Sequence, residues 1–299
     1  MTDDLRLERR PELDRGVLVA AFRGWNDGGQ GASLAGSFLA RAWAAERFGE
    51  IDPETFFDFQ ATRPHVSLVE GMSRRIDWPE NAFFHATPPG APRDVVLLLG
   101  IEPSLRWRSF TEIVSGLARE LRVEMVVTLG SLLADVPHTR AAPVTGSASD
   151  EELVHRLGLQ QSRYEGPTGI VGVLHDACRA SGLQSASLWA AVPHYVSLTP
   201  SPRAAKALCD RLAALLGVEL DTSDLDEAGE EYSQQVSEAV AADADTAAYV
   251  EELERRVDSA TDDELHIASG ESLAAELTRF LRERDQEEDG GDAARGGQP

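Results

Sequence analysis

Four mainly apolar runs, each followed by a segment with helical spacing, constrain the fold of this chain most. The runs cover residues 16–22, 95–101, 123–129 and 185–192. An apolar run without polar alternation is typical of a strand buried on both faces of a parallel sheet. Helical spacing follows at residues 34–43, from Ser109 onwards, at 173–179 and at 202–216. The alternation predicts an α/β fold with a mainly parallel sheet flanked by helices.

Shorter signals surround this core. Residues 56–59, 66–69 and 82–86 have the composition of extended pieces, with hairpins among them. Ser109 and Glu112 have capping-box spacing, which predicts that a helix begins near Ser109. We expect an N-terminal arm at residues 1–15 and an α/β core domain at 16–220.

The composition changes after residue 220. Apolar residues recur at helical spacing over 236–257 and again over 273–281, so we expect an all-helical appendage at residues 221–285. Capping-box spacing at 223–226 and 261–264 predicts further helix starts. Residues 286–299 hold no apolar side chain larger than alanine, which predicts a disordered tail.

Charge and composition exclude several classes of protein. The net charge of -23 opposes binding to nucleic acid or to anionic lipid, because both need Lys and Arg to neutralise phosphate. No stretch approaches the ~20 apolar residues of a membrane span, and the first ten residues lack the apolar core of a signal peptide, so we expect a cytoplasmic protein. Cys178 and Cys209 both lie in helical segments, which predicts two reduced thiols and neither a disulfide nor a thiolate metal site.

Polar side chains follow the apolar runs, at the strand ends where ligands of open α/β sheets bind. They are the candidate ligand-binding residues of this chain: Asn26, Asp27, Gly28, Gly29, Arg63, Glu102, Arg106, Arg108, His138 and His194. Backbone amides at the two glycines could hold an anion at a helix start, and the arginines could hold phosphate or carboxylate. The histidines could act as acid or base near neutral pH.

Each of these interpretations has a structural alternative. Gly28 and Gly29 could simply permit a tight turn capped by Asn26 or Asp27, and the arginines could pair with nearby carboxylates. No catalytic triad, dinucleotide fingerprint or P-loop is present in the sequence, and the histidines lack metal-pair spacing. We therefore predict no catalytic residue, no metal and no cofactor.

Several loops carry distinctive motifs, namely Gly24-Trp-Asn-Asp-Gly-Gly-Gln-Gly-Ala-Ser33 and residues 57–64, 100–107, 129–140, 164–169 and 189–195. Together these segments resemble the proteasome assembly chaperone 2 family, in particular its actinobacterial branch. It implies an α/β fold of the nucleoside phosphorylase and peptidyl-tRNA hydrolase type. It also implies a homo-oligomer, with a trimer among the orders to consider, and protein partners that include proteasome subunits.

Two functions follow as hypotheses. The leading one is a non-enzymatic, assembly-chaperone-like interaction protein whose strand-end loops and acidic helices contact a partner. The alternative is a small-molecule enzyme of phosphorylase or hydrolase type that binds a nucleoside-like or anionic ligand at the strand ends, in a pocket joining Asn26, Asp27, Glu102, His138 and His194.

Overall fold

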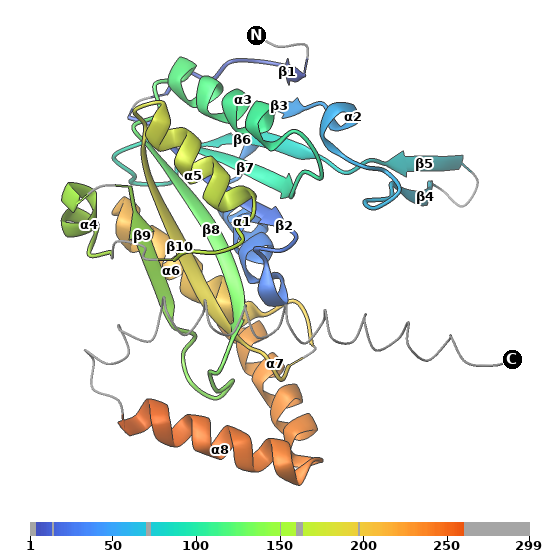
Figure 1. Ribbon diagram of the computed structural model, residues 1–299, viewed down its shortest axis with the longest axis vertical. Coiled ribbons are helices and arrows are strands. Elements are labelled where there is room, and N and C mark those ends of the chain that lie inside the picture. Colours follow the sequence, from blue (N-terminus) through green and yellow to red (C-terminus); the bar gives the residue numbers. More distant parts are fainter. Residues whose placement is uncertain are drawn as a thin grey trace, which may run out of the picture.

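One mixed sheet organises the structure, which is a computed structural model describing residues 4–13, 15–69, 73–149, 151–159, 164–196 and 198–259. Within these ranges, eight strands form the sheet in the order β1-β3-β6-β7-β2-β8-β10-β9 (Figure 1). Their bounds are β1 Leu5–Leu7, β2 Val17–Arg23, β3 Glu46–Ile51, β6 Asn81–Ala86, β7 Val95–Ile101, β8 Met125–Ala134, β9 Val144–Ala148 and β10 Gln184–Pro193.

The four predicted strands are the centre of this sheet. β7, β2, β8 and β10 are neighbours and pair in parallel. In β2 every side chain from Val17 to Phe22 is at most 1% exposed, because helices cover both faces. The predicted α/β fold with a mainly parallel, helix-flanked sheet is therefore confirmed, whereas its phosphorylase-like or hydrolase-like character stays a prediction.

Antiparallel strands extend the sheet on both sides. β6, β3 and β1 follow β7 in antiparallel pairs, and β9 lies antiparallel to β10. The pieces predicted at 66–69 and 82–86 are strands, but the one predicted at 56–59 is wrong. Asp52 and Pro53 start a short helix there, α2 (Pro53–Phe56), and the Asp52 carboxylate accepts from the amide of Glu54 at 3.1 Å.

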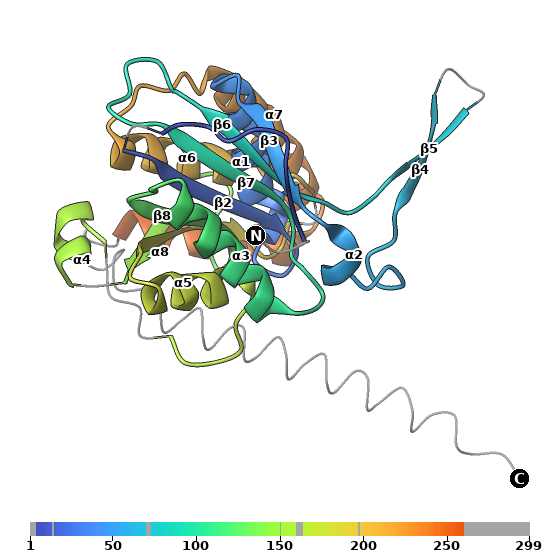
Figure 2. The ribbon, with the colours of Figure 1, turned by 90° about the horizontal axis from the view of Figure 1, so that it is seen from above.

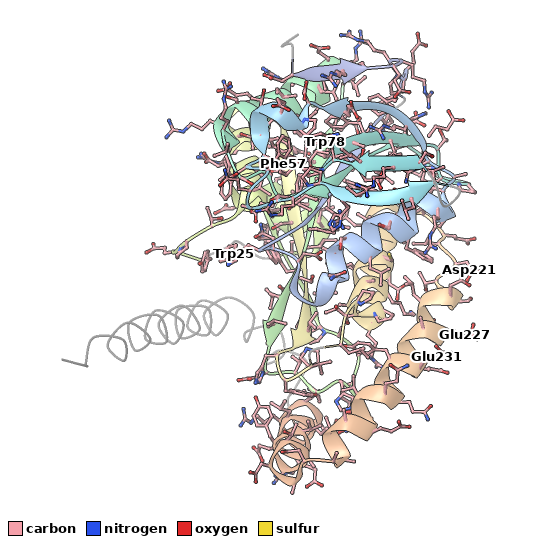
Figure 3. The ribbon with its side chains drawn as sticks, turned by 90° about the vertical axis from the view of Figure 1, so that its right-hand side faces the viewer. Trp25, Phe57, Trp78, Asp221, Glu227 and Glu231 are labelled. Atoms are coloured by element: carbon pink, nitrogen blue, oxygen red, sulfur yellow. The ribbon has the colours of Figure 1, made fainter. Side chains whose placement is uncertain are left out.

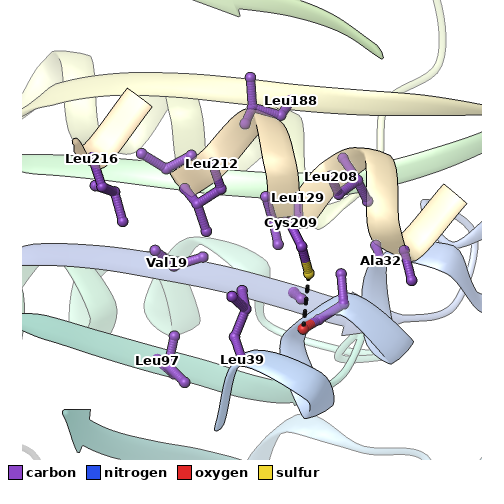
Figure 4. Packing of buried hydrophobic residues seen from close by; sticks show 14 of the residues in the cluster. Val19, Ala32, Leu39, Leu97, Leu129, Leu188, Leu208, Cys209, Leu212 and Leu216 are labelled. Carbon is purple, nitrogen blue, oxygen red and sulfur yellow. Dashed lines mark hydrogen bonds between the residues drawn. The ribbon is translucent and has the colours of Figure 1, made fainter. Parts of the chain in front are cut away.

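Helices cover the two faces of the sheet in pairs (Figure 2). α1 (Gly31–Ala42) and α6 (Pro202–Leu216) form one core with the sheet, while α3 (Trp107–Glu120) and α5 (Ile170–Ala180) form the other. Figure 4 shows Cys209 in the first core, where its thiol lies 3.9 Å from the carbonyl of Ala35. A 3₁₀ turn, η1 (Gly28–Gln30), precedes α1, and α4 (Glu151–Leu157) follows β9.

The helix predicted near Ser109 is α3, which begins two residues earlier at Trp107, so Ser109 does not cap it. Arg106 precedes it with a φ of 54°, a left-handed turn that brings the chain into the helix. The Trp107 indole also donates to the carbonyl of Pro103, which fixes this first turn. Ser109 is therefore an interior residue of the helix.

Two helices follow the core where one was predicted over 236–257. They are α7 (Ser223–Ala241) and α8 (Ala244–Ser259), and both lie at one end of the long axis (Figure 1). The Asp243 carboxylate accepts from the amide of Thr246 at 2.7 Å, so it caps a new helix and ends the old one. α7 buries Tyr232 and Val236 in its packing against the protein.

The proposed domain boundaries stay a prediction. Residues 5–7 of the expected N-terminal arm pair with β3 and so belong to the sheet. The helix expected at 273–281, the helix start at 261–264 and the tail at 286–299 lie outside the described residues. No described helix combines the length and the apolar character that a membrane crossing requires.

β4 (His65–Val69) and β5 (Ser73–Asp77) form a second, two-stranded sheet. This hairpin leaves the body of the molecule near the start of β6 and projects away from it, as both ribbon views show (Figures 1 and 2).

Candidate functional site at the carboxyl ends of the parallel strands

The four parallel strands end at one edge of the sheet, and the segments that follow them carry the predicted site residues except Arg63, which lies between α2 and β4. Asp27 lies in the loop after β2 and is only 7% exposed. Its Oδ1 accepts from the amides of Ala32 at 2.9 Å and Ser33 at 3.1 Å, so the side chain caps the start of α1. The Ser131 hydroxyl of β8 lies 3.3 Å from the same oxygen. Asp27 therefore joins the first loop to the neighbouring strand.

Burial raises the pKa of Asp27 above its usual value, and these hydrogen bonds only partly offset that effect. Its second oxygen, Oδ2, is buried and has no hydrogen-bond partner among the described residues. The protein thus stabilises Oδ1 of this carboxylate by hydrogen bonds, whereas no hydrogen bond offsets the removal of Oδ2 from water.

Gly28 and Gly29 pack tightly against the strands beside the loop. A Cβ at Gly28 would lie 2.9 Å from the Cα of Leu132, and one at Gly29 would lie 2.8 Å from Val192. Gly29 also has a φ of 57°, in the left-handed region that favours glycine. Close packing and this turn are sufficient to explain both glycines.

Glu102, in the loop after β7, is the hydrogen-bond centre of the site. Its Oε1 accepts from the side-chain amide of Asn26 at 3.1 Å and from the backbone amide of Ile170 at 2.7 Å. Its Oε2 accepts from the backbone amide of Trp25 at 3.1 Å. Ile170 is the first residue of α5, so this carboxylate also lies at a helix N-terminus, where negative charge is favourable. One side chain thereby holds three segments together.

The arginines do not join this centre. Arg63, Arg106 and Arg108 are exposed, and no hydrogen bond or ion pair links their guanidinium groups to another described residue. Arg140 instead makes a two-point contact with Asp258 of α8, at 2.9 and 2.7 Å. The structure therefore shows no cluster of guanidinium groups among the described residues.

The histidines lie in a second group, which we call the helix joint. It consists of Asp135, His138, Arg140, His194, Tyr195, Ser237, Tyr249, Glu254 and Asp258. His138 is 3% exposed, and its ring nitrogens lie 2.9 Å from the hydroxyls of Tyr195 and Ser237. His194 and Tyr249 both reach Asp135, at 3.1 and 2.5 Å. The joint therefore ties α7 and α8 to the ends of β8 and β10.

Burial shifts the pKa of two side chains of the joint. It lowers the pKa of His138 and raises the pKa of Tyr195 to about 12, so both side chains are held neutral at pH 7. The cavity next to His138 has a volume of only about 10 Å³, room for about one water molecule. Within the described residues, no group of three His, Cys, Asp or Glu could hold a metal ion.

The structure thus brings Asn26 together with Glu102, and places His138 and His194 in a separate joint. Sequence reasoning missed Ser131, Ile170, Tyr249 and the carboxylates of α8. Their contacts span large separations, such as the 114 residues between Asp135 and Tyr249, so no local pattern could have revealed them. The predicted ligand-binding set as a whole stays a prediction.

Exposed apolar side chains are found at the same ends of the strands, after β2, β7 and β10, at the end of β8 and before α5. We call this group the strand-end face; its members are Trp25, Leu105, Leu133, Tyr164 and Leu198, all between 37% and 48% exposed. Figure 3 shows Trp25 standing away from the ribbon. At this edge the polar side chains of Asp27 and Glu102 are used internally, while bulky apolar ones face outwards.

Comparison with known proteins decides the family. The model of the PAC2 family matches residues 21–240. The chain belongs to the PAC2 family. This confirms the resemblance found in the sequence. No curated protein matches the chain.

Solved structures of PAC2 proteins are similar to this chain. A PAC2 family protein from Streptomyces avermitilis is 46% identical with a TM-score of 0.74, over 79% of this chain and 99% of its own. A proteasome-assembly chaperone homologue from Mycobacterium tuberculosis is 45% identical with a TM-score of 0.72, over 78% and 99%. An archaeal proteasome activator from Pyrococcus furiosus, at 18% identity and a TM-score of 0.64 over 79% and 97%, shares the fold.

Proposed function

We propose that this PAC2 protein is a non-enzymatic interaction protein that works as an assembly chaperone, with proteasome subunits as its partners. The observation that carries the proposal is the strand-end face. Bulky apolar side chains such as Trp25 and Leu133, each 46% exposed, are characteristic of protein-binding surfaces when they gather on one side of a molecule. The similarity to a proteasome-assembly chaperone homologue supports this choice of partner.

The proposal includes a cytoplasmic location and a homo-oligomeric working unit. The net charge of -23 disfavours lipid and nucleic-acid surfaces, which supports the cytoplasmic location. The helices α7 and α8 contribute exposed carboxylates next to the strand-end face, and we include them in the partner-binding surface.

Point variants test this proposal better than truncation does. Removing residues 221–285 would uncover the side of the core that buries Leu225 and Tyr232, so lost binding could reflect unfolding. We expect Trp25→Ala combined with Leu133→Asp to weaken binding to purified proteasome core particles and their free subunits by about tenfold or more, since each exposed anchor is worth about 1 kcal/mol or more.

Arg119→Glu, on the exposed surface of α3, is the matched control and should bind as the wild type does. Affinity capture from native lysate with mass spectrometry then identifies the partner. Recovery of proteasome subunits by the wild type and their loss in the double variant supports the proposal. Equal recovery by both proteins would refute it.

The enzyme alternative receives no support from a specific observation on the described residues. Thermal-shift measurement with nucleosides, nucleotides and phosphate remains its direct test, because a ligand at 100 times its dissociation constant stabilises a protein by about 2.7 kcal/mol.

A further inference from the structure

A groove of about 470 Å³ lies between the end of α1 and the start of α7, and its floor is apolar. Phe38 and Trp43 line it and are only 5% and 6% exposed, and Leu220 contributes from the segment before α7. The Trp43 indole nitrogen is buried and has no hydrogen-bond partner among the described residues. A buried donor without an acceptor is rare in proteins, and a group supplied by a ligand of the groove would satisfy it.

The rim of the groove carries charge of mainly one sign. Glu219, Asp221 and Asp224 are exposed carboxylates of the lining, and Arg41 at the end of α1 is a cation there. Hydrogen bonds from the hydroxyl and the amide of Ser223 hold the pKa of Asp221 below its usual value. Asp221 is therefore ionised at neutral pH, and the rim as a whole is negative.

The negative charge continues from the groove along α7. Residues 219–231 contain seven carboxylates and no lysine or arginine. Asp224, Glu227 and Glu231 are spaced three and four residues apart, which places them on one side of the helix. Figure 3 shows Asp221, Glu227 and Glu231 along its outer side. We call these four residues the acidic stripe.

The acidic stripe is unfavourable in the protein without a partner, because like charges three or four residues apart destabilise a helix. Nearby Asp226 has Lys206 Nζ at 3.5 Å. Asp224, Glu227 and Glu231 have no ion-pair partner within the described residues. The helix dipole favours carboxylates in the first turn of α7, so it does not account for Glu231 in the third turn. A cationic partner would relieve the repulsion along the stripe.

The groove lies at the amino ends of the parallel strands, away from the strand-end face. Pro89 lines the groove and follows β6 shortly after Ala86, which pairs with Val95 at the start of β7. Figure 3 shows Trp25 of the strand-end face and Asp221 of the acidic stripe on opposite sides of the molecule. The groove and the stripe are therefore a second surface.

We propose that the groove and the acidic stripe form a docking site for an arginine-rich amphipathic segment of a partner protein. An apolar side chain of the segment enters the groove, and its arginines pair with the carboxylates of the stripe, which guanidinium groups bind at two points. This inference goes beyond the proposed function, because it assigns a different surface and a different partner chemistry.

The length of the surface favours a peptide segment over a small organic cation. Asp224 and Glu231 are seven residues apart, about 10 Å along the axis of α7, and the groove extends the surface beyond them. A small cation in the groove would leave Glu227 and Glu231 without a partner. Arg41 repels arginines at the α1 side, so the basic part of the segment lies along α7.

The test measures binding of a defined probe to the full chain by fluorescence anisotropy. The probe is a fluorescein-labelled peptide of about twelve residues, with two leucines at one end followed by three arginines spaced three and four residues apart. A second peptide with glutamate in place of each arginine is its control. At about 0.15 M salt, where charges are screened beyond about 8 Å, the arginine peptide should bind and the glutamate peptide should not.

Charge-reversal variants locate the binding. Asp224→Arg should weaken binding of the arginine peptide by about tenfold or more, and Arg41→Glu should strengthen it. Glu112→Arg and Arg119→Glu, on the exposed surface of α3, change the net charge by the same amounts and should leave the affinity unchanged. Leu220→Ser removes an apolar side chain of the floor and should also weaken binding.

A further variant separates lost binding from a damaged helix. Asp224 lies in the first turn of α7, where an arginine is unfavourable, whereas Glu231 lies in the third turn. Glu231→Arg should therefore weaken binding while circular dichroism and the melting temperature stay those of the wild type. Trp25→Ala combined with Leu133→Asp should bind the peptide as the wild type does, so the strand-end face is tested separately.

The outcomes are distinct. Weaker binding by Asp224→Arg and Glu231→Arg, with both α3 variants unchanged, supports the docking site. A wild type that does not bind the arginine peptide overturns it, and so does equal weakening by Asp224→Arg and Glu112→Arg, which would show attraction by net charge alone. If light scattering shows that Asp224→Arg lowers the mass of the protein, a second copy occupies the groove and the proposal is also overturned.

Discussion

Replacing Glu102 by alanine should destabilise the protein more than any other single change at the strand ends. The carboxylate accepts from Ile170, Asn26 and Trp25, and the first two of these residues are 0% and 4% exposed. A buried donor that loses its acceptor costs about 1–3 kcal/mol, and the charge at the α5 N-terminus adds up to about 1 kcal/mol. The Trp25 amide can find water instead. We therefore expect a loss of about 3 kcal/mol.

For a chain of this size, such a loss lowers the melting temperature by about 6–12 °C. Calorimetry and urea titration measure the loss, and hydrogen exchange locates it in the first turn of α5. Glu112→Ala, an exposed carboxylate on α3, is the control and should change stability by less than about 0.5 kcal/mol. Glu102→Gln should lie between the two. Equal melting temperatures for Glu102→Ala and Glu112→Ala would show that the hydrogen bonds of Glu102 do not stabilise the fold.

Three further experiments, two with variants and one by thiol labelling, probe the buried groups. The raised pKa of Asp27 means that the folded state binds the proton more tightly, so its contribution is favourable at low pH and is lost as pH rises through that pKa. Asp27→Asn should remove this pH dependence from the free energy of unfolding measured in urea. If the unfolding free energies of wild type and variant change in parallel with pH, the prediction is contradicted. The lowered pKa of His138 acts in the opposite sense, because the unfolded state takes up the proton first as pH falls below about 6.5. The stability difference between wild type and His138→Gln should therefore shrink on acidification, and a difference that stays constant would be inconsistent with a neutral buried ring. Burial raises the pKa of Cys178 and Cys209 to about 12, so a thiol reagent should label neither in the native protein and both in urea; native labelling would disprove their burial.

The central strands could be predicted because burial on both faces leaves no room for polar alternation. The outer strands β1 and β3 could not. β3 reads Glu46–Ile51 with polar residues at both ends of a short apolar centre, and its strand state depends on pairing with β6. β1 has only three residues and exists through its contact with β3. Such strands are a consequence of tertiary pairing, which local sequence does not record.

The helices α7 and α8 illustrate a different limit of prediction from sequence. The apolar spacing over residues 236–257 continues across Asp243, so periodicity alone predicts one helix. A single cap, the Asp243 carboxylate on the amide of Thr246, divides it. An Asp or Ser within a stretch of helical periodicity can either lie inside a helix with its side chain exposed or cap the start of a new helix. Which of the two occurs depends on where the chain must turn in order to pack.

The candidate site shows why polar residues at strand ends are ambiguous in a sequence. A loop that leaves a buried strand carries backbone amides with no partner in the sheet, and an acidic side chain satisfies them as readily as it would bind a ligand. Asp27 and Glu102 both take the first role here, since their contacts run to backbone amides of Ala32, Ser33 and Ile170. What distinguishes the two roles is the surrounding surface. Where polar groups are turned inwards and Trp25 and Leu133 are turned outwards, the edge is suited to bind an apolar protein surface.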